Sequence, residues 1–227
     1  MHLPRNIWNC MAKQKLNKKV VVGITGNFGS GKSTVARLLA SYEAKIIDAD
    51  KIAHRCLSRG NKVYRKIVSV FGDTILGKNK EIDRCRLGKV VFGDKKLLKK
   101  LNGIVHPEVI RIIKSKINSK KKGVMVLDAP LLLEAGLRSA VDKLIVVTIN
   151  RDTQIMRLLK KTSLKKADIL KRIKSQIPLR AKARLADFII DNNGSLAKTR
   201  KQVKGIIVNW QPKKEGKFDS SSCGTRS

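Results

Sequence analysis

Five short apolar runs along this chain have the pattern of buried β-strands. Each is nearly continuous and rich in Val and Ile, as expected of strands that are covered on both faces. The runs occupy residues 20–25, 44–47, 124–128, 144–149 and 188–191. Between them, apolar residues recur every three to four positions, which is typical of helices that pack on one side. This alternation predicts an α/β fold in which helices flank a five-stranded parallel sheet.

Two long stretches show helical spacing and little strand pattern. The first, 51–122, predicts an inserted helical segment, in which 97–101 and 109–113 fit two helices and Pro107 suits the first turn of the second. The second, 151–184, is a basic helical region that precedes the last strand. A closing amphipathic helix is expected at about 195–208.

The two ends of the sequence are polar. Residues 1–18 are predicted to form an N-terminal extension, and 211–227 a disordered basic and Ser-containing tail. The domain itself is therefore expected at 19–210.

A glycine-rich loop follows the first strand. The run from Gly26 to Ser33 fits GxxxxGK[ST] and is followed by apolar residues at helical spacing. A strand, a glycine loop and a helix in this order form a phosphate cradle, because backbone amides and the helix N-terminus face the anion. Lys32 would reach the β- and γ-phosphates and the Ser33 hydroxyl would bind Mg²⁺. The residues expected to bind ATP here are Asn27, Phe28, Gly29, Ser30, Gly31, Lys32, Ser33 and Thr34. The alternative is a glycine-rich turn without a ligand.

The chain is strongly basic. Its 227 residues have a formal net charge of +34, from 35 lysines and 16 arginines against 17 acidic residues. One explanation of such charge is nucleic-acid binding. The other combines the capture of small polyanionic substrates with a general drift of the composition toward lysine. The lysines are spread over the whole chain and are not interleaved with aromatic residues. They also outnumber the arginines, whose forked guanidinium is the usual side chain for specific nucleic-acid recognition. We therefore favour polyanionic substrates together with the drift toward lysine. No specific nucleic-acid partner is expected.

The sequence also gives expectations about the cellular location and the oligomeric state of the protein. The four cysteines are scattered without a CxxC pair, which favours reduced thiols and a cytoplasmic protein. No apolar run approaches the roughly 20 residues that span a bilayer, and the first ten residues lack the apolar segment of a secretory signal. We therefore expect no membrane partner, and a monomer or weak homo-oligomer.

Many proteins share this phosphate cradle, so other motifs must distinguish among them. The Asn-Lys-x-Asp signature of guanine-nucleotide-binding proteins is not found. The chain from Val20 to about Val208 resembles the dephospho-CoA kinase family, through several motifs that occur in order. They are Ile24-Thr25-Gly26; Asp48-Ala49-Asp50-Lys51-Ile52-Ala53-His54; Phe71-Gly72; Leu101-Asn102-Gly103-Ile104-Val105-His106-Pro107; Asp128-Ala129-Pro130-Leu131-Leu132-Leu133-Glu134; Gln154 with Arg157-Leu158; Arg172-Ile173 with Gln176, Pro178 and Lys182; and Ala186-Asp187 before Asp191-Asn192-Asn193-Gly194.

The resemblance implies a P-loop kinase fold with an inserted helical substrate domain and a helical lid. It implies ATP-dependent phosphorylation of the ribose 3′-hydroxyl of dephospho-CoA, the last step of coenzyme A synthesis, with Mg²⁺ as cofactor. ATP and dephospho-CoA are the expected partners. The alternatives are a nucleoside or nucleotide kinase with the same cradle, and a nucleic-acid-binding P-loop ATPase.

Two acids at strand ends are candidates for the chemistry. Asp50 follows the second strand, where it would face the ligand crevice, and is our candidate for the base that takes or orients the acceptor proton. The alternative role of Asp50 is to cap the helix that begins near Lys51. Asp48 is the weaker candidate for the base. It could instead contact the substrate, a water bound to Mg²⁺, or Lys32. Asp128 ends the third strand and would hold the metal's water shell or, alternatively, cap the turn before Pro130.

Further residues are expected to contact substrate or nucleotide. Lys32, Asp50 and Arg157 are the expected catalytic residues. Arg157 lies in the lid region, from which it would neutralise the charge of the transferred phosphate. Lys161 shares the helix face of Arg157, but the family pattern has Arg at this position. A solvated helix face is the alternative for this pair. The resemblance places Asp48, His54, His106, Pro130 and Leu131 at the substrate, and Asn192 and Gly194 at the adenine. Solvent exposure of His54, packing of His106 and a plain turn at 192–194 are the alternatives.

Overall fold

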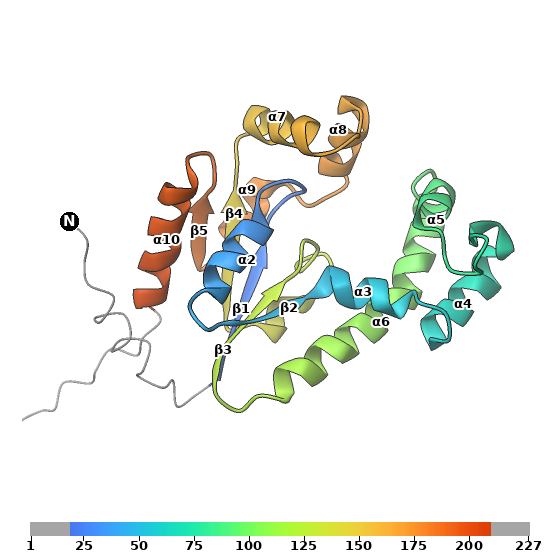
Figure 1. The fold of residues 1–227 in the computed structure, drawn as a ribbon, viewed down its shortest axis with the longest axis horizontal. Coiled ribbons are helices and arrows are strands. Elements are labelled where there is room, and N and C mark those ends of the chain that lie inside the picture. The colour runs from blue at the N-terminus through green and yellow to red at the C-terminus, as the bar shows by residue number, and fades with distance from the viewer. Residues whose placement is uncertain (1–18, 210–227) are drawn as a thin grey trace, which may run out of the picture.

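The computed structural model describes residues 19–209, and a parallel sheet lies at its centre (Figure 1). Five strands lie in the order β2-β3-β1-β4-β5, and every pairing is parallel. The strands are β1 (Lys19–Thr25), β2 (Lys45–Asp48), β3 (Gly123–Asp128), β4 (Lys143–Thr148) and β5 (Phe188–Asp191). The predicted α/β fold is confirmed, and each strand lies within one residue of its expected bounds. The expected extension and tail lie outside the described residues.

Side-chain alternation along the strands builds a separate core on each face of the sheet. Val22 and Ile24 of β1 pack in one core with residues of α2 (Lys32–Ala40) and α10 (Leu196–Asn209). Val21, one position earlier, belongs to the other core, which includes Ile113 of α6 (Lys95–Asn118). Successive side chains of a strand point to opposite faces, so a central strand with helices on both sides must be apolar throughout. Val22, Ile24 and Ile113 are fully buried.

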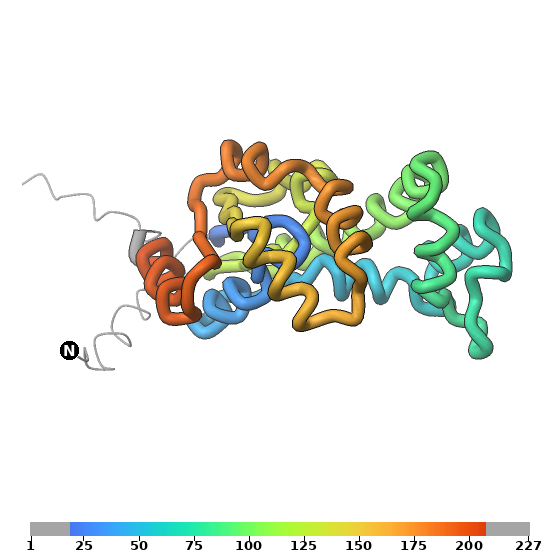
Figure 2. Tube along the Cα trace, turned by 90° about the horizontal axis from the view of Figure 1, so that it is seen from above, coloured from blue at the N-terminus to red at the C-terminus, as the bar shows by residue number. Residues whose placement is uncertain are grey.

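A helical extension leaves the sheet after β2 and returns to it through α6 (Figures 1 and 2). It contains α3 (Ala49–Cys56), α4 (Lys62–Phe71), the 3-10 turn η1 (Asp73–Ile75) and α5 (Arg84–Val91). Val63 and Ile67 are the buried residues of α4, which packs against α6. These elements fall in the region 51–122 that the sequence predicts to be helical.

One prediction within this extension is wrong. Pro107 lies inside α6, a single helix of 24 residues, and does not begin a second helix. Proline removes one backbone hydrogen bond and crowds the carbonyl four residues earlier, which here belongs to Gly103. Burial of Val109, Ile113 and Ile117 on one face stabilises the helix beyond Pro107.

The region 151–184 crosses the carboxyl ends of the strands (Figure 2). It comprises α7 (Arg151–Lys161), α8 (Lys166–Lys174) and α9 (Leu179–Arg184). Between β3 and β4 lies a further 3-10 turn, η2 (Leu137–Ala140). Within residues 19–209, no helix combines the length and the apolarity that crossing a membrane requires.

Candidate active site

The glycine loop between β1 and α2 is built for a close approach of backbone to ligand. Gly29 and Gly31 have φ values of +76° and +91°, in the left-handed region that favours glycine. Gly31 is the N-cap of α2 and offers no capping side chain, so the first amides of the helix need a partner from outside. Among the described residues, none accepts a hydrogen bond from the amides of Gly29, Gly31, Lys32 or Ser33. Four free amides at a helix N-terminus form an anion site.

Lys32 extends back under this loop. Its ammonium donates to the carbonyl oxygens of Gly26 (3.0 Å) and Asn27 (3.1 Å). The residue is 8% exposed, and burial lowers the pKa of its ammonium to about 8. The charges of Asp128 and Asp50 act in the opposite direction. Lys32 is therefore still charged at neutral pH and lies among the predicted catalytic acids.

Three carboxylates gather where β2 and β3 end. Asp48 and Asp128 are paired positions of the two strands, so their side chains start at the same level of the sheet. Asp50 lies in the first turn of α3, directly after β2. The backbone amide of Lys51 donates to Asp48 Oδ1 at 2.8 Å, so Asp48 and not Asp50 caps α3. The capping role considered for Asp50 thus belongs to its neighbour.

Burial and neighbouring charges raise the pKa of two of these acids. Burial, with Asp48 and Asp50 nearby, raises the pKa of Asp128 to about 6, against the opposing effect of Lys32. Burial and the charge of Asp48 also raise the pKa of Asp50. A crowded, partly buried set of carboxylates with one lysine is short of positive charge, and a divalent cation would supply it.

The donor set suits Mg²⁺ bound largely through water and phosphate. Across the described part of the chain, no three His, Cys, Asp or Glu side chains gather in a way that could hold a metal by themselves. Mg²⁺ commonly takes only one or two protein oxygens beside nucleotide phosphates. Asp128 and the exposed hydroxyl of Ser33 could supply such oxygen ligands.

Asp128 gives a prediction for the ligand-free protein. Its pKa lies above the ordinary value of 3.8, so the folded state binds more protons than the unfolded state between about pH 4 and 6. The free energy of unfolding therefore falls as pH rises through this range. Asp128→Asn should raise that free energy at pH 7 by about 1–2 kcal/mol, allowing for solvent screening of a partly exposed group. Thermal melts at several pH values would measure the gain, which should shrink below pH 6.

The same substitution should slow turnover with Mg²⁺ and ATP, because it removes a charge that balances the cation. If the melting temperature of the variant at pH 7 is lower than that of the parent, the prediction that the charged Asp128 side chain destabilises the ligand-free fold is wrong.

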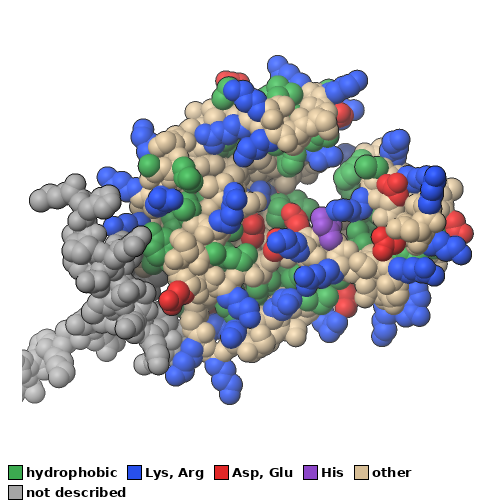
Figure 3. Space-filling view, viewed as in Figure 1, with side chains coloured by type: hydrophobic (Ala, Val, Ile, Leu, Met, Phe, Trp, Pro, Cys, Tyr) green, Lys and Arg blue, Asp and Glu red, His purple; other side chains and the backbone are tan. Residues whose placement is uncertain are grey.

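His54 lies beside Asp50 and meets a residue that the sequence did not indicate. The Arg84 guanidinium, from the start of α5, lies 2.8 Å from His54 Nε2. His54 is among the groups that lower the pKa of Asp50. Arg84 belongs to none of the motifs found in the sequence, and the packing of α5 against α6 and η1 brings it here. In Figure 3, acidic side chains and a histidine lie in the hollow between the sheet and the extension, and Lys and Arg side chains surround it.

The loop after β3 joins the site through its backbone. The Pro130 carbonyl oxygen accepts hydrogen bonds from Thr25 Oγ1 and Lys182 Nζ, both at 3.1 Å. Lys182 is fully buried and also pairs with Glu134 at 2.8 Å. Leu131, predicted to contact the substrate, is 42% exposed. A large apolar side chain in the open beside a polar site is available to a ligand.

His106 is placed differently from the other predicted substrate contacts. It is half-buried in the middle of α6, and burial lowers its pKa. It is not among the charges that act on Lys32, Asp50 or Asp128. His106 belongs to α6 of the helical extension, and its contact with the substrate stays a prediction.

Arg157 and Asn192 meet in the loop after β5. The Arg157 guanidinium donates to the carbonyl oxygens of Asn192 (2.7 Å), Asn193 (3.1 Å) and Gly194 (3.4 Å). The Asn192 side chain donates to the Ser30 carbonyl oxygen (2.8 Å) and accepts from the Thr199 hydroxyl (3.0 Å). Arg157 is therefore close to the predicted adenine loop, and the Asn192 amide is engaged by the phosphate loop itself.

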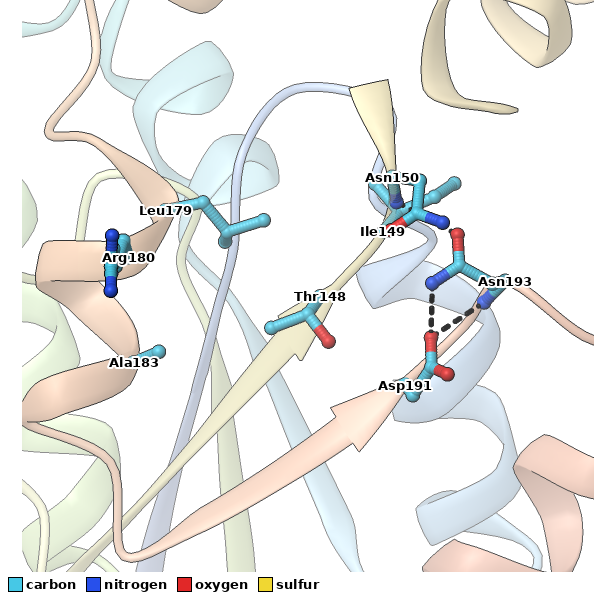
Figure 4. A pocket seen from close by; sticks show the side chains of 8 residues that line it. All are labelled: Thr148, Ile149, Asn150, Leu179, Arg180, Ala183, Asp191 and Asn193. Atoms are coloured by element: carbon cyan, nitrogen blue, oxygen red, sulfur yellow. Dashed lines mark hydrogen bonds between the residues drawn. The ribbon is translucent and has the colours of Figure 1, made fainter. Parts of the chain in front are cut away.

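A crevice of about 420 Å³ lies next to this loop (Figure 4). Asn193 and Asp191 form one wall, where Asp191 accepts a hydrogen bond from the Asn193 amide at 2.9 Å, and α9 forms the opposite wall. No residue of 26–33 and none of the three carboxylates lines it. The crevice therefore adjoins the predicted adenine loop but is separate from the reacting groups.

A phosphate loop, carboxylates at the neighbouring strand ends and helices crossing above them define a P-loop kinase. A profile described as dephospho-CoA kinase matches residues 20–198. The dephospho-CoA kinase of Carboxydothermus hydrogenoformans is 43% identical over 194 residues, which cover 84% of this chain and 94% of that protein. The Bacillus cereus dephospho-CoA kinase is 40% identical over 198 residues, with 84% and 97% covered. The chain belongs to the dephospho-CoA kinase family.

Solved structures agree with this assignment. A dephospho-CoA kinase from Campylobacter jejuni superposes with a TM-score of 0.63 at 31% identity, covering 84% of this chain and 96% of that one. A crystal structure of a Thermus thermophilus protein superposes with a TM-score of 0.74, also at 31% identity, covering 86% and 100%. The family resemblance and the P-loop kinase fold predicted from the sequence are confirmed.

Proposed function

We propose that this chain transfers the γ-phosphoryl group of ATP to the ribose 3′-hydroxyl of dephospho-CoA, giving coenzyme A. One observation carries the proposal beyond family membership. The free amides of the phosphate loop and the Lys32 ammonium lie beside Asp50 at the same edge of the sheet. An anion site next to a partly buried carboxylate can hold a triphosphate while the carboxylate orients an alcohol.

Asp50 is the proposed base. Burial and Asp48 raise its pKa, which makes the carboxylate a better proton acceptor, and Lys32 limits the increase. Asp48 is held by the cap of α3 and by its ion pair with Lys51, so it is less free to meet a substrate hydroxyl. In a loose transition state the proton leaves late, so Asp50 mainly orients the hydroxyl and then takes its proton.

Cations would balance the charge of the transferred group. Lys32 would exchange its loop carbonyl partners for the β- and γ-phosphates, and Ser33 and Asp128 would hold Mg²⁺ or its water. Bound Mg²⁺ would neutralise the β- and γ-phosphate oxygens. Arg157, bonded to the loop at 192–194, lies on the lid helix α7 and would complete the neutralisation. His54, Pro130 and Leu131 are the proposed contacts of dephospho-CoA.

The product identifies the reaction. We expect incubation with ATP, Mg²⁺ and dephospho-CoA to add one phosphoryl group, which mass spectrometry detects and phosphorus NMR assigns to the ribose 3′ position. Adenosine, AMP and shikimate are the matched competing acceptors in a coupled ADP-release assay. We expect kcat/KM for dephospho-CoA to exceed that for each of them by about 10³-fold or more, because recognition of a whole substrate contributes to the transition state.

Efficient transfer to a nucleoside or nucleotide would make the chain a kinase of another acceptor. ATP hydrolysis that depends on added DNA or RNA would instead support the nucleic-acid alternative suggested by the net charge of +34.

A further inference from the structure

The backbone of Phe28, the third residue of the phosphate loop, is held by two glutamines from the lid region. Its amide donates to Gln176 Oε1 at 2.7 Å, and its carbonyl oxygen accepts a hydrogen bond from Gln154 Nε2. Gln154 lies on α7 and is 4% exposed, whereas Gln176 lies in the link between α8 and α9. One segment that precedes α8 in the sequence and one that follows it therefore bind the backbone of the same loop residue.

Side-chain contacts strengthen this junction. The Arg172 guanidinium of α8 lies 5.5 Å from the centroid of the Phe28 ring, within the range of a cation–π contact. A Cβ at Gly29 would lie 2.6 Å from Leu158, so α7 packs directly on the loop at the next residue. A larger side chain at position 29 would require Leu158, or α7 with it, to shift.

The two bonds divide the loop into an anchored part and a part free for ligand. The Phe28 amide is used by the lid, whereas the amides of Gly29, Gly31, Lys32 and Ser33 have no acceptor among the described residues. Glycines lose much conformational freedom when they are fixed, and Gly29 and Gly31 are held at positive φ values. An anchor on Phe28 therefore reduces the ordering that ATP would otherwise have to impose on the loop.

We propose that Gln154 and Gln176 are positioning residues that fix Phe28, and with it the phosphate-binding amides, before ATP arrives. The same bonds hold the lid that carries Arg157 against the loop, because Gln154 lies one turn before Arg157 on α7. The inference rests on the proposed function for its kinetic consequence, but the anchoring of Phe28 can be measured without any substrate.

The direct test is amide exchange at Phe28, followed by NMR in the full-length, ligand-free protein. Gln176→Ala should quicken exchange of the Phe28 amide by about tenfold, the effect of losing one net hydrogen bond. Exchange at Val35 and Ala36 of α2 should stay within about twofold of the parent. Lys160→Ala, an exposed change on α7, is the matched control and should leave exchange at Phe28 unchanged.

The direction of each bond gives a second, sharper test. Gln176 accepts from Phe28, so Gln176→Glu keeps the acceptor and should preserve slow exchange at Phe28. Gln154 donates to Phe28, so Gln154→Glu loses the donor and sets a carboxylate against a carbonyl oxygen. It should quicken exchange at Phe28 by about tenfold, as Gln176→Ala does. Because both glutamates match glutamine in size, this pair remains informative if the alanine variants fail to fold.

Steady-state kinetics measure the consequence for ATP. In Gln154→Ala and Gln176→Ala, KM for ATP should rise about fivefold to tenfold, while kcat changes less than about threefold and KM for dephospho-CoA less than about twofold. Lys160→Ala should match the parent in all three constants.

Parent-like exchange at Phe28 in Gln176→Ala and Gln154→Glu would overturn the proposal. Equal rises of KM for both substrates would also overturn it, because they would show a general loss of lid structure. If the parent itself fails to phosphorylate dephospho-CoA, the proposed function fails, and the exchange experiment still decides whether the two glutamines anchor the loop.

Discussion

Asp50→Asn is expected to reduce kcat by about 10²–10⁴-fold, the usual contribution of a positioned base. An amide keeps the size of the side chain but cannot take the proton of the substrate hydroxyl. The affinity for ATP should change little, because the amides and Lys32, not Asp50, form the proposed phosphate site. Single-turnover kinetics with dephospho-CoA, together with calorimetric titration of ATP in the presence of Mg²⁺, would measure the two effects separately.

Two further variants make this experiment specific. Asp152→Asn changes an exposed carboxylate at the start of α7 and should leave kcat unaltered. Asp48→Asn keeps a side chain that can cap α3 and should lower kcat far less than Asp50→Asn. If Asp48→Asn is the more damaging change, the role of base belongs to Asp48; near-normal turnover of Asp50→Asn would exclude Asp50 from that role.

Lys32→Met should lower kcat/KM for ATP by about 10²–10³-fold, because it removes a positive charge placed at the β- and γ-phosphates. The thioether retains the length of the side chain and its packing. Burial already lowers the pKa of the ammonium to about 8, so removing this poorly solvated charge should not destabilise the fold. Thermal melting of the variant at or above the parent's temperature would show that the loss of activity is not unfolding.

The pKa of Lys32 also predicts a pH profile. As pH rises through about 8, the free enzyme loses the ammonium, and kcat/KM for ATP should fall. In the complex the phosphates raise the pKa, so kcat should persist to higher pH. Lys32→Met should lack the decline of kcat/KM at high pH. A profile that declines identically in parent and variant would assign the titration to another group.

The hydrophobic pattern was sufficient to predict the sheet because a buried parallel strand must be apolar on both faces. The same pattern was insufficient at Pro107, where a local rule predicted a helix start. Burial of Val109, Ile113 and Ile117 on one face of α6 outweighs the single backbone hydrogen bond that Pro107 removes. Packing against the rest of the domain therefore decided the length of this helix.

The grouping of the acids followed from strand order. Because parallel strands end at the same edge, residues just after the second and third apolar runs were expected to meet near the glycine loop. The pairing of Asp48 with Asp128 places these two acids at the same edge of the sheet. The sequence suggested a capping role for Asp50 as the alternative to the base, and the hydrogen bond from Lys51 to Asp48 shows that its neighbour caps α3.

The linear sequence determined the phosphate loop, the two-faced sheet and the class of kinase, because each depends on residues that are neighbours or recur at a fixed period. Tertiary structure decided the lid contacts on Phe28, which join positions 126 and 148 residues apart, and the meeting of Arg84 with His54, 30 residues apart. A glutamine side chain has no preferred distant partner until packing supplies one. Those contacts therefore required the folded chain, since no spacing along the sequence encodes them.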